Sequence, residues 1–479
     1  MQKGLQSAIL LKIMLPTPLR RTKIICTIGP SCWDQKTLYS LADNGMNVAR
    51  LNFSHGDLSL HQKVIAMIRA YNDSHPLNVA MMLDTKGAEI RSGDVKEPIQ
   101  ISKDEEIIFT SRKKPDETRK VVEVGYDKFA KDVLETGVIL LDNGELSFDI
   151  VRVDKNGEVT ARAREDGKIG SRRHINLPGA DLDMPSITEK DWKDIEFGAR
   201  ENLDFLALSF IREEDEVHAV RKLLRKLNSK SQIVSKIETR NAVENIASII
   251  DASDAIMVAR GDLGAEVPFE RLPLIQDEIV CRCKDAGKPV IIATHMLESM
   301  CVHPIPTRAE VMDTSHAVAT GADTSMLSGE TASGGRPLEA LRAMDKIERA
   351  MEAHMAKLET VYEIRFKSKE EEEMNVAVSL AEKCNIDAFV VITESGKTAR
   401  YISKFRPKVP IIALTPNAAV QRSLLLCYGI YPIVVPFESS DDDTMSAGIE
   451  LSKNIGLLQK DQRAILLKNK AKSPKVITI

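Results

Sequence analysis

The chain has 479 residues, of which 43% are hydrophobic, enough to build sizeable cores in roughly two to four domains of about 100–200 residues each. The formal net charge is −4 and only 4% of the residues are aromatic, which argues against a nucleic-acid-binding protein that neutralises phosphates or stacks bases. No window of about 18 apolar residues occurs, so we expect no transmembrane helix and no membrane partner.

The first 33 residues contain no acidic residue and several basic ones. This composition fits the stub of an organelle transit peptide or an unstructured start, and both readings stay open. We assign residues 1–21 to a flexible N-terminal segment. The seven cysteines are odd in number and contain no CxxC pair, which predicts reduced thiols in an intracellular protein.

Eight short apolar runs rich in Val, Ile and Leu are typical of strands buried on both faces of a parallel sheet. They cover residues 23–29, 48–53, 79–84, 204–210, 232–238, 255–260, 289–295 and 324–330. Amphipathic helical patterns fill most of the gaps, at 34–44, 58–71, 189–201, 213–227, 239–250, 271–286 and 308–320. Eight alternating units predict a TIM (β/α)8 barrel, here formed by residues 22–92 and 184–350.

Residues 85–203 separate the third run from the fourth, which is too long for one crossover helix. The middle of this stretch holds short β-like segments at 105–110, 121–124, 138–142, 148–153 and 159–163. The pairs Asn143-Gly144 and Asn156-Gly157 lie between them, and Asn-Gly favours hairpins. We therefore predict a small β-barrel domain, residues 93–183, inserted after the third barrel strand as a lid.

After Pro337 we expect a long helix to about residue 363, and then a charged surface linker at 367–373. Helices at 375–384 and 398–405 alternate with strands at 388–392 and 410–413. This pattern predicts a third, regulatory domain, residues 351–479, with an open α/β sheet.

Within this domain Ser395-Gly396-Lys397-Thr398 resembles the end of a Walker A loop, but Val391 stands where the full motif needs glycine. The segment is therefore not a nucleotide-hydrolysing P-loop. It lies between a predicted strand and a predicted helix, where backbone N–H groups can bind an anion. A site for a phosphate-bearing effector and a plain helix cap remain equal alternatives.

Polar residues gather at the carboxyl ends of the predicted barrel strands, where TIM-barrel enzymes place their active sites. The set comprises Arg50, Asn52, Ser54, His55, Asp84, Thr85, Lys236, Glu238, Arg260, Asp262, Thr294, His295, Ser328 and Glu330. Charges are costly to bury unless they are paired or bound to metal. The joint occurrence of so many polar groups at one end of the barrel favours a functional site.

Spacing adds to this interpretation, because residues two apart on a strand share a face. Lys236 would face the same way as Glu238, and Arg260 the same way as Asp262. Glu238 and Asp262 could together hold Mg²⁺ or Mn²⁺, while Lys236 and Arg50 offer positive charge to a phosphoryl group or an enolate. Asn52, Ser54, Asp84 and Thr85 supply oxygen atoms for a monovalent cation.

Each residue alone has a simpler explanation. Lys236 and Glu238 could form an ordinary ion pair inside the barrel, and Arg260 to Asp262 a turn with a helix cap. The Thr294 hydroxyl could bond to the backbone, and His55 and His295 could be packed or surface histidines. Met296 and Met300 read as core residues.

Five segments resemble the pyruvate kinase family: residues 23–30, 45–56, 84–87, 257–264 and 326–332. The resemblance runs in motif order from about Thr22 to Pro337 and weakens afterwards. It implies phosphoryl transfer from phosphoenolpyruvate to ADP, giving ATP and pyruvate in the last step of glycolysis, in a homotetramer that needs Mg²⁺ and K⁺.

The resemblance also implies roles for single residues, with Lys236, Arg50 and Thr294 catalytic. Substrate would contact Arg50, Lys236, Gly261, Asp262, Thr294 and Ser328; Mg²⁺ would bind Glu238 and Asp262; and K⁺ would bind Asn52, Ser54, Asp84 and Thr85. The nucleotide would contact Asn52, Phe53, Ser54, His55, Arg91 and Arg173, and an effector phosphate Thr393, Ser395, Gly396, Lys397 and Thr398. A glutamate at the position of Glu89 goes with K⁺ dependence in this family, whereas a lysine there replaces the cation.

Some features depart from the family pattern. Ala88 stands where proline is common and His295 where glutamine is common, although neither carries the expected chemistry. Residues 464–479 lack the aromatic, Gly-Pro-rich loop of members activated by fructose 1,6-bisphosphate, which puts that activation in doubt. Two rival functions remain: another phosphoenolpyruvate-handling barrel lyase or phosphotransferase, and a non-catalytic regulatory subunit of a hetero-oligomeric pyruvate kinase.

Overall fold

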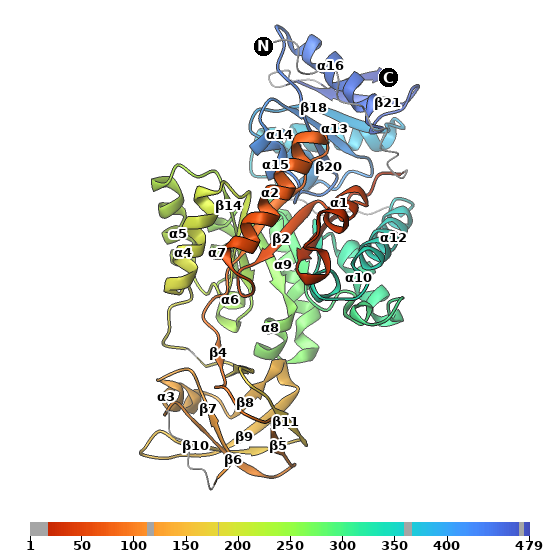
Figure 1. Cartoon of the computed structure of the whole chain (residues 1–479). Helices are drawn as coiled ribbons and strands as arrows, with labels where there is room; N and C mark the ends of the chain where they lie inside the picture. Colours follow the sequence, from red (N-terminus) through yellow and green to blue (C-terminus); the bar gives the residue numbers. More distant parts are fainter. Residues whose placement is uncertain (1–17, 113–118, 181, 359–365, 469–473) are drawn as a thin grey trace.

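The computed structural model describes residues 18–112, 119–180, 182–358, 366–468 and 474–479. Residues 1–17 of the N-terminal segment predicted at 1–21 lie outside them. A central barrel has the inserted domain at one end and the C-terminal domain at the other (Figure 1).

Eight parallel strands close the central barrel in the order β1-β17-β16-β15-β14-β13-β3-β2, which confirms the predicted TIM barrel. They are β1 (Lys23–Ile28), β2 (Val48–Asn52), β3 (Ala80–Asp84), β13 (Phe205–Leu208), β14 (Gln232–Ile237), β15 (Ala255–Ala259), β16 (Val290–Ala293) and β17 (Thr324–Leu327). Every residue of β1, β3, β13, β15, β16 and β17 is buried, as expected for strands covered on both faces.

The helices surround the barrel as α1 (Gln35–Asp43), α2 (Leu58–Ser74), α4 (Glu189–Arg200), α5 (Glu214–Lys226), α9 (Leu272–Ala286), α10 (Arg308–Thr320) and α12 (Pro337–Met355). The helix expected at 239–250 is divided at Asn245 into α6 (Arg240–Glu244) and α7 (Ile246–Ala252). A further short helix, α8 (Arg260–Glu266), starts directly after β15. The expectation that Arg260 and Asp262 share a strand face is therefore wrong, because positions two apart on a helix lie about 200° around its axis.

The inserted domain is a seven-stranded sheet in the order β4-β12-β8-β9-β10-β6-β7. The strands are β4 (Ile90–Arg91), β6 (Glu106–Thr110), β7 (Val121–Glu123), β8 (Val138–Leu141), β9 (Leu146–Val153), β10 (Val159–Ala163) and β12 (His174–Asn176); a separate pair joins β5 (Ile99–Ile101) to β11 (Gly167–Ile169). A bridge between Ser92 and Val124 brings the two edges of the larger sheet together, so it curls into a barrel around Phe109, Phe129 and Phe148.

The C-terminal domain has a five-stranded sheet in the order β20-β19-β18-β21-β22, parallel except for β22, as the α/β pattern predicts. Its strands are β18 (Ala388–Ile392), β19 (Ile411–Thr415), β20 (Ile430–Val434), β21 (Arg463–Leu467) and β22 (Lys475–Thr478); its helices are α13 (Lys369–Lys383), α14 (Lys397–Lys404), α15 (Ala418–Ser423) and α16 (Asp441–Asn454).

The charged linker expected at 367–373 is wrong, because α13 begins within it, at Lys369. Ser368 caps this helix by accepting from the backbone N–H of Glu371, and three glutamates in the first turn match the positive end of the helix dipole. The Glu371 carboxylate is buried because Lys404 of α14 donates to it at 2.7 Å. The helix after Pro337 ends at Met355, earlier than expected.

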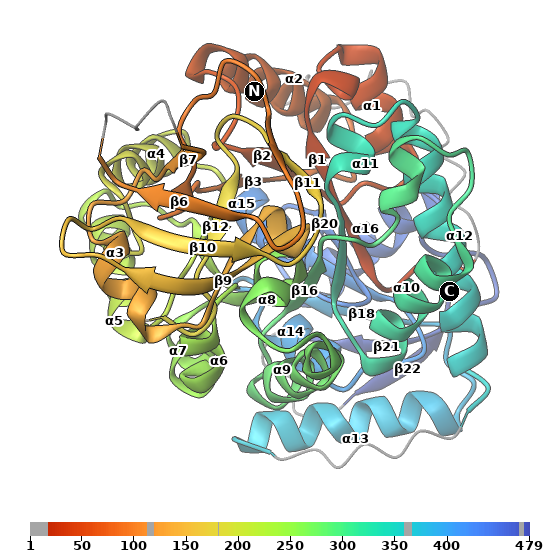
Figure 2. The ribbon, with the colours of Figure 1, turned by 90° about the horizontal axis from the view of Figure 1, so that it is seen from below.

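Ion pairs hold the C-terminal domain against the amino ends of the barrel strands. Arg406 binds Asp323 at 2.7 Å, just before β17, and Arg422 binds Asp204 at 2.8 Å, just before β13. The opposite, carboxyl end of the barrel faces the inserted domain, as the view from that end shows (Figure 2).

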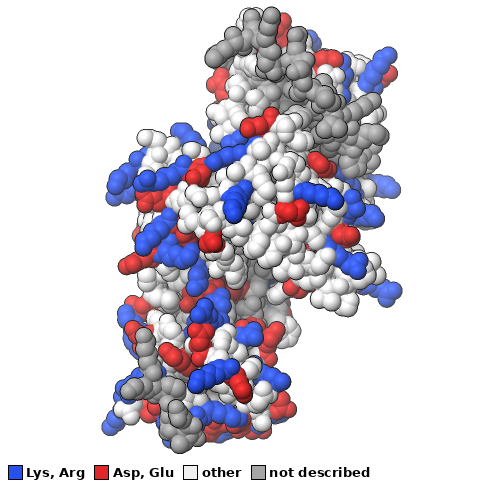
Figure 3. Space-filling model, viewed as in Figure 1, with Lys and Arg blue, Asp and Glu red and all other residues white. Residues whose placement is uncertain are grey.

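The visible surface carries interspersed charges of both signs, with no large basic field on the face shown (Figure 3). None of the described helices is both long and apolar enough to cross a membrane. All seven cysteines are free thiols, as predicted.

Candidate active site

Lys236 lies at the centre of the polar cluster, near the carboxyl end of β14. Its buried Nζ donates to Asp84 Oδ1 at 3.1 Å and to Ser209 Oγ at 2.7 Å, and lies 2.9 Å from Glu238 Oε1. Burial by itself lowers the pKa of Lys236, but the carboxylates of Asp84 and Glu238 outweigh it and raise that pKa above its usual value. Lys236 is therefore a fixed positive charge in a water-poor site.

Arg50 adds a second cation, from β2. Its Nε donates to Asp84 Oδ2 at 2.6 Å, and its Nη1 donates to the Thr27 hydroxyl at 2.9 Å. Burial tends to raise the pKa of Asp84, but Arg50 and Lys236 together lower it. Asp84 is thus an ionised carboxylate that holds both cations side by side.

Glu238 and Asp262 are the predicted divalent-metal ligands. Glu238 is buried beside Lys236, whereas the Asp262 side chain is 28% exposed. Glu238 Oε2 accepts from the Phe210 N–H at 2.7 Å. Burial raises the pKa of Glu238; Lys236 opposes this, while the negative charge of Asp262 adds to it. Burial also raises the pKa of Asp262. Two carboxylates that disfavour each other's charge fit a divalent cation, which would relieve that repulsion.

No group of three or more His, Cys, Asp or Glu side chains able to hold a metal occurs within the described ranges. A site with only two carboxylates suits Mg²⁺ or Mn²⁺, which take further ligands from substrate phosphate and water.

Arg260, expected on the same face as Asp262, points elsewhere. Its guanidinium donates to Asp313 Oδ1 at 2.7 Å and to the Thr294 carbonyl at 2.6 Å. Its charge is used to join α8, α10 and the end of β16. This is the consequence of β15 ending at Ala259 rather than continuing through the predicted site residues.

Thr294 and Gly261 are brought together at the rim of the barrel. The Gly261 N–H donates to Thr294 Oγ1 at 2.8 Å, and that hydroxyl donates to the Ala293 carbonyl at 2.6 Å. The backbone-bonded alternative for this hydroxyl is thus observed. Thr294 and His295 have φ values of 66° and 54°, a left-handed backbone that costs energy and is concentrated at functional sites.

Ser328 and Glu330 follow β17 but differ in environment. The buried Ser328 hydroxyl oxygen has no hydrogen-bond partner within the described part of the chain. Glu330 instead accepts from the backbone N–H groups of Leu297 at 2.9 Å and Ser328 at 2.7 Å. Glu330 is therefore a structural group that joins two strand ends.

The four residues predicted to bind K⁺ share one corner of the site, since Asn52 and Asp84 are direct neighbours on paired strands. Asn52 Oδ1 accepts from the Ser54 N–H at 3.0 Å, and Thr85 Oγ1 accepts from the Ser209 N–H at 3.0 Å. All four side chains carry oxygen atoms, which is the ligand type that alkali cations take.

The residues predicted to bind nucleotide come from both sides of the opening. The Phe53 ring is buried and stacks on His61 at 4.1 Å, so only its backbone can face a ligand. His55 is exposed. From the inserted domain, Arg91 binds Glu89 at 2.7 Å, and the half-exposed Arg173 lies 3.1 Å from Asp142. The exposed ends of Arg91 and Arg173 leave them available for phosphate.

Three groups in this network were not singled out from the sequence. Ser209 and Thr27 contact Lys236 and Arg50, and His174 of the inserted domain lies 3.5 Å from Asp262. Ser209 and Thr27 sit at or next to the ends of predicted strands, so the rule that located their neighbours could have found them. No sequence signal pointed to His174.

The Thr393 to Thr398 turn lies in the C-terminal domain at the start of α14. The Thr393 hydroxyl oxygen accepts from the Gly396 N–H at 2.9 Å, and Gly396 has a φ of 81°. Ser395 and Lys397 are exposed at this turn, and the Lys397 ammonium lies 5.2 Å from the Tyr401 ring centroid. The geometry fits a helix start and leaves the effector reading open.

Comparisons with known proteins all point to one family. The family model described as pyruvate kinase, barrel domain, matches residues 19–341, and the one described as pyruvate kinase, alpha/beta domain, matches residues 371–475. Plastidial pyruvate kinase 2 of Arabidopsis thaliana is 40% identical over 95% of this chain and 79% of its own length. The pyruvate kinase of Dictyostelium discoideum is 39% identical over 95% and 93%. A crystal structure of a pyruvate kinase from Cryptosporidium parvum superposes with a TM-score of 0.87, at 35% identity and 96% coverage of both chains.

Proposed function

The chain belongs to the pyruvate kinase family, and from that premise we propose how its own residues carry the reaction. The enzyme transfers the phosphoryl group of phosphoenolpyruvate to ADP, giving ATP and pyruvate. The bond from phosphorus to the enol oxygen breaks, a bond to a β-phosphate oxygen of ADP forms, and the enolate takes up a proton. The observation that carries our assignment is the buried Lys236 ammonium between two carboxylates.

Lys236 and Arg50 would stabilise the charge that shifts during transfer. Both are held by Asp84, so neither has to reorganise when the substrate arrives. Such prepositioned charge in a water-poor site is among the largest contributions to catalysis. We assign Lys236 to the moving phosphoryl group and the enolate oxygen, and Arg50 to the phosphate.

Glu238 and Asp262 would hold Mg²⁺ or Mn²⁺, supported by the burial of Glu238, the raised pKa values of both carboxyl groups and their oxygen-only chemistry. A divalent cation bound there supplies positive charge to the substrate's phosphate and carboxylate oxygens. Gly261, Thr294 and Ser328 would line the substrate on the same rim. The Ser328 hydroxyl oxygen is buried and without a partner in the described part of the chain, so it would need a small local shift to reach the substrate. Thr294 would help to deliver the proton through water.

The nucleotide would bind between Asn52 to His55 on the barrel and Arg91 and Arg173 on the inserted domain. Closure of that domain would exclude water from the transfer. We also propose a homotetramer, located in the cytoplasm or a plastid stroma, and domain limits of 22–92 with 184–350, 93–183 and 351–479. The plastidial and bacterial names among the relatives support these two locations.

A coupled lactate dehydrogenase assay, with phosphoenolpyruvate, ADP, Mg²⁺ and K⁺, tests the function directly. ADP-dependent pyruvate formation supports it. Pyruvate formed equally without ADP would point to another phosphoenolpyruvate-handling barrel enzyme. No turnover by a folded protein would favour the regulatory-subunit reading, although that class should have lost Lys236, Glu238 or Asp262, which this chain keeps.

We expect the activity to depend on K⁺, because a glutamate at the position of Glu89 goes with that dependence in the family; Glu89 is paired with Arg91 at 2.7 Å and lies near enough to Asp262 to raise its pKa. The parent enzyme should lose most of its kcat when tetramethylammonium replaces K⁺. Glu89→Lys should keep much more of its activity without K⁺, since the ammonium group replaces the cation. The control is Glu97→Lys, the same charge change at an exposed position of the inserted domain. Equal parent activity with and without K⁺ would disprove the dependence.

We expect a sugar phosphate to act at the Thr393 to Thr398 turn. A panel of glucose 6-phosphate, ribose 5-phosphate and fructose 1,6-bisphosphate should contain one compound that lowers the KM for phosphoenolpyruvate. Lys397→Ala should weaken its effect about tenfold or more, the usual value of one charge-assisted contact. Lys460→Ala, an exposed lysine elsewhere in the same domain, serves as control. No response to any compound would leave the turn as a plain helix start.

A further inference from the structure

The inserted domain is joined to the barrel by two chain connections, and both rest on one loop. The first connection leaves β3 at Thr85, and the second returns through residues 182–188 to α4. The loop consists of residues 209–212, directly after β13, and we call it the pivot loop. It contacts each connection through different residues, described in turn below.

The first connection is bound at the start of the pivot loop. The Ser209 hydroxyl donates to the Thr85 carbonyl at 2.7 Å, and the Ser209 N–H donates to Thr85 Oγ1 at 3.0 Å. Gly87 lies so close that an added Cβ would come within 2.6 Å of the Phe210 ring and 2.7 Å of Ser209 Cβ. No larger residue fits at this position without moving the loop, so the contact fixes the start of the first connection.

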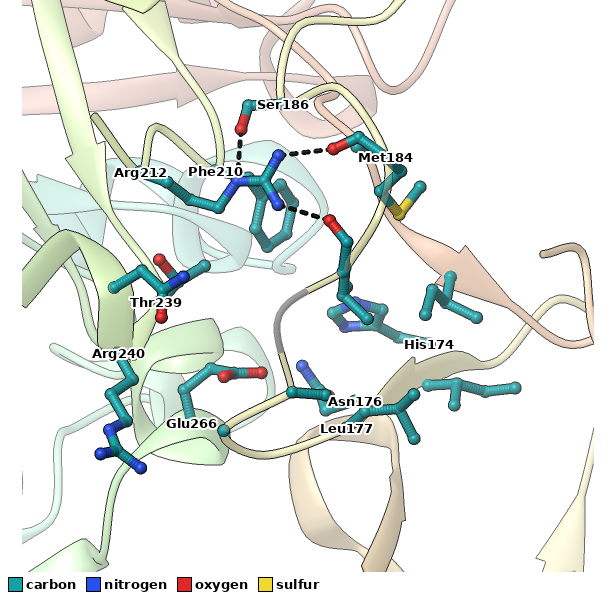
Figure 4. A pocket seen from close by; sticks show the side chains of 17 residues that line it. His174, Asn176, Leu177, Met184, Ser186, Phe210, Arg212, Thr239, Arg240 and Glu266 are labelled. Carbon is teal, nitrogen blue, oxygen red and sulfur yellow. Dashed lines mark hydrogen bonds between the residues drawn. The ribbon is translucent and has the colours of Figure 1, made fainter. Parts of the chain in front are cut away.

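The second connection is bound at the end of the pivot loop by a single side chain. The Arg212 Nε donates to Ser186 Oγ at 2.8 Å, its Nη1 to the Leu182 carbonyl at 2.8 Å and its Nη2 to the Met184 carbonyl at 2.5 Å. Figure 4 shows this guanidinium facing the returning chain at the edge of a pocket. One planar group thus fixes three points along five residues.

The backbone of Arg212 is itself held on the barrel side. Its N–H donates to Glu216 Oε2 at 2.7 Å, and its carbonyl accepts from Asn245 Nδ2 at 3.0 Å. The first connection is also held by α4, the barrel helix to which the second connection leads, since Asp191 Oδ1 accepts from the N–H groups of Lys86 and Gly87 at 3.1 Å each. Both connections are therefore anchored to the barrel by side-chain contacts.

The same loop contacts the reacting groups. Ser209 Oγ accepts from Lys236 Nζ at 2.7 Å, and the Phe210 N–H donates to Glu238 Oε2 at 2.7 Å. Phe210 has a φ of 53°, a strained backbone for a bulky residue, which only a well-fixed surrounding maintains. Four consecutive residues therefore link both connections to the predicted catalytic lysine and a predicted metal ligand.

We propose that Arg212 is a positioning residue, which fixes the angle of the inserted domain and couples it through the pivot loop to Lys236 and Glu238. The pocket beside it, lined by apolar Leu177, Leu182, Met184 and Phe210, gives the returning chain room to move. Without the guanidinium, the inserted domain would hold Arg91 and Arg173 at the wrong distance from the nucleotide. This inference rests on the proposed nucleotide contacts.

The test compares Arg212→Gln, Arg212→Lys and the parent enzyme in the coupled assay. For Arg212→Gln we expect kcat/KM for ADP to fall by about 100-fold, with an increase in KM, because a displacement of about 1 Å in a reacting geometry has that cost. Arg212→Lys can make only some of the three contacts, so its kcat/KM for ADP should lie between the values of the parent enzyme and Arg212→Gln. A purely structural role would lower the melting temperature and the active fraction while leaving KM unchanged.

Arg221→Gln is the matched control, because Arg221 also donates to a backbone carbonyl, that of Ala252 at 2.7 Å, but does not contact the inserted domain's connections. The inference is overturned if Arg212→Gln keeps the parent's KM and kcat, or if Arg221→Gln changes them equally. Should Arg212→Gln not fold, Ser186→Ala removes one of the three contacts and must shift KM for ADP in the same direction. Turnover by the parent in the same assay separates failure of this inference from failure of the proposed function.

Discussion

Replacing Lys236 with methionine is expected to lower kcat by about 10²–10³-fold, the cost of removing a prepositioned group that stabilises the transition state. Methionine keeps the length and apolar stem of the side chain but lacks the ammonium. Binding of phosphoenolpyruvate should be largely spared, because Arg50 remains held by Asp84. Single-turnover kinetics together with a substrate titration separate the two effects.

The same substitution leaves Glu238 without its cation, and removing one partner of a buried pair destabilises a protein by about 3–5 kcal/mol. Lys404→Met is the matched control, since Lys404 is a buried lysine paired with Glu371 in the C-terminal domain. It should show a comparable loss of stability in urea unfolding with a near-parent kcat. If Lys236→Met retained kcat within tenfold of the parent, Lys236 would not be the catalytic cation.

Glu238→Gln is expected to weaken divalent-metal binding by more than about 100-fold. Losing a residue that only supports a metal ligand weakens binding by about 10–100-fold, and losing a ligand itself should cost more. The glutamine amide oxygen can still accept from the Phe210 N–H, so the pivot loop should keep its place. Lys236 keeps Asp84 as its carboxylate partner when Glu238 loses its charge, so no buried cation is left unpaired. Since burial raises the pKa of Glu238, removing its charge also relieves a desolvation penalty, and the metal-free variant should unfold at nearly the parent temperature.

Titration with Mn²⁺, followed by electron paramagnetic resonance, measures the binding without relying on turnover. Glu266→Gln is the control: it lies one turn further along α8 from Asp262, and burial raises its pKa to about 7. This control should bind Mn²⁺ as the parent does. Parent-like Mn²⁺ affinity in Glu238→Gln would remove Glu238 from the metal site and leave its ion pair with Lys236 as its main role.

The barrel itself could be predicted from the sequence because its strands are short apolar runs, and a run buried on both faces has no polar alternation to confuse its limits. The strand ends followed from the same pattern, and with them Lys236, Glu238, Arg50 and Asp84. The assumption that residues two apart share a strand face was wrong at Arg260. There β15 ends at Ala259, one residue earlier than predicted, and α8 begins. Strand and helix starts look alike over three residues, so local pattern cannot decide which way such side chains point.

The prediction of a surface linker at residues 367–373 was wrong for a related reason. A run of charge reads as a solvated linker, but Glu371 is buried because Lys404, which lies 33 positions further along the chain, pairs with it. Composition carries no information on such distant partners. His174 was missed in the same way, since its proximity to Asp262 exists only because the inserted domain folds back over the barrel.

The architecture, the family and the residues at the strand ends could be predicted from periodicity and from motifs within short stretches. The contacts among distant residues came from the folded structure alone: Asp84 holds Arg50 and Lys236 together, Ser209 belongs to this network, and Arg212 binds the returning connection. These contacts join residues up to 152 positions apart. Closing the barrel brings them together, and their energies come from burial and from paired charges that no local window contains.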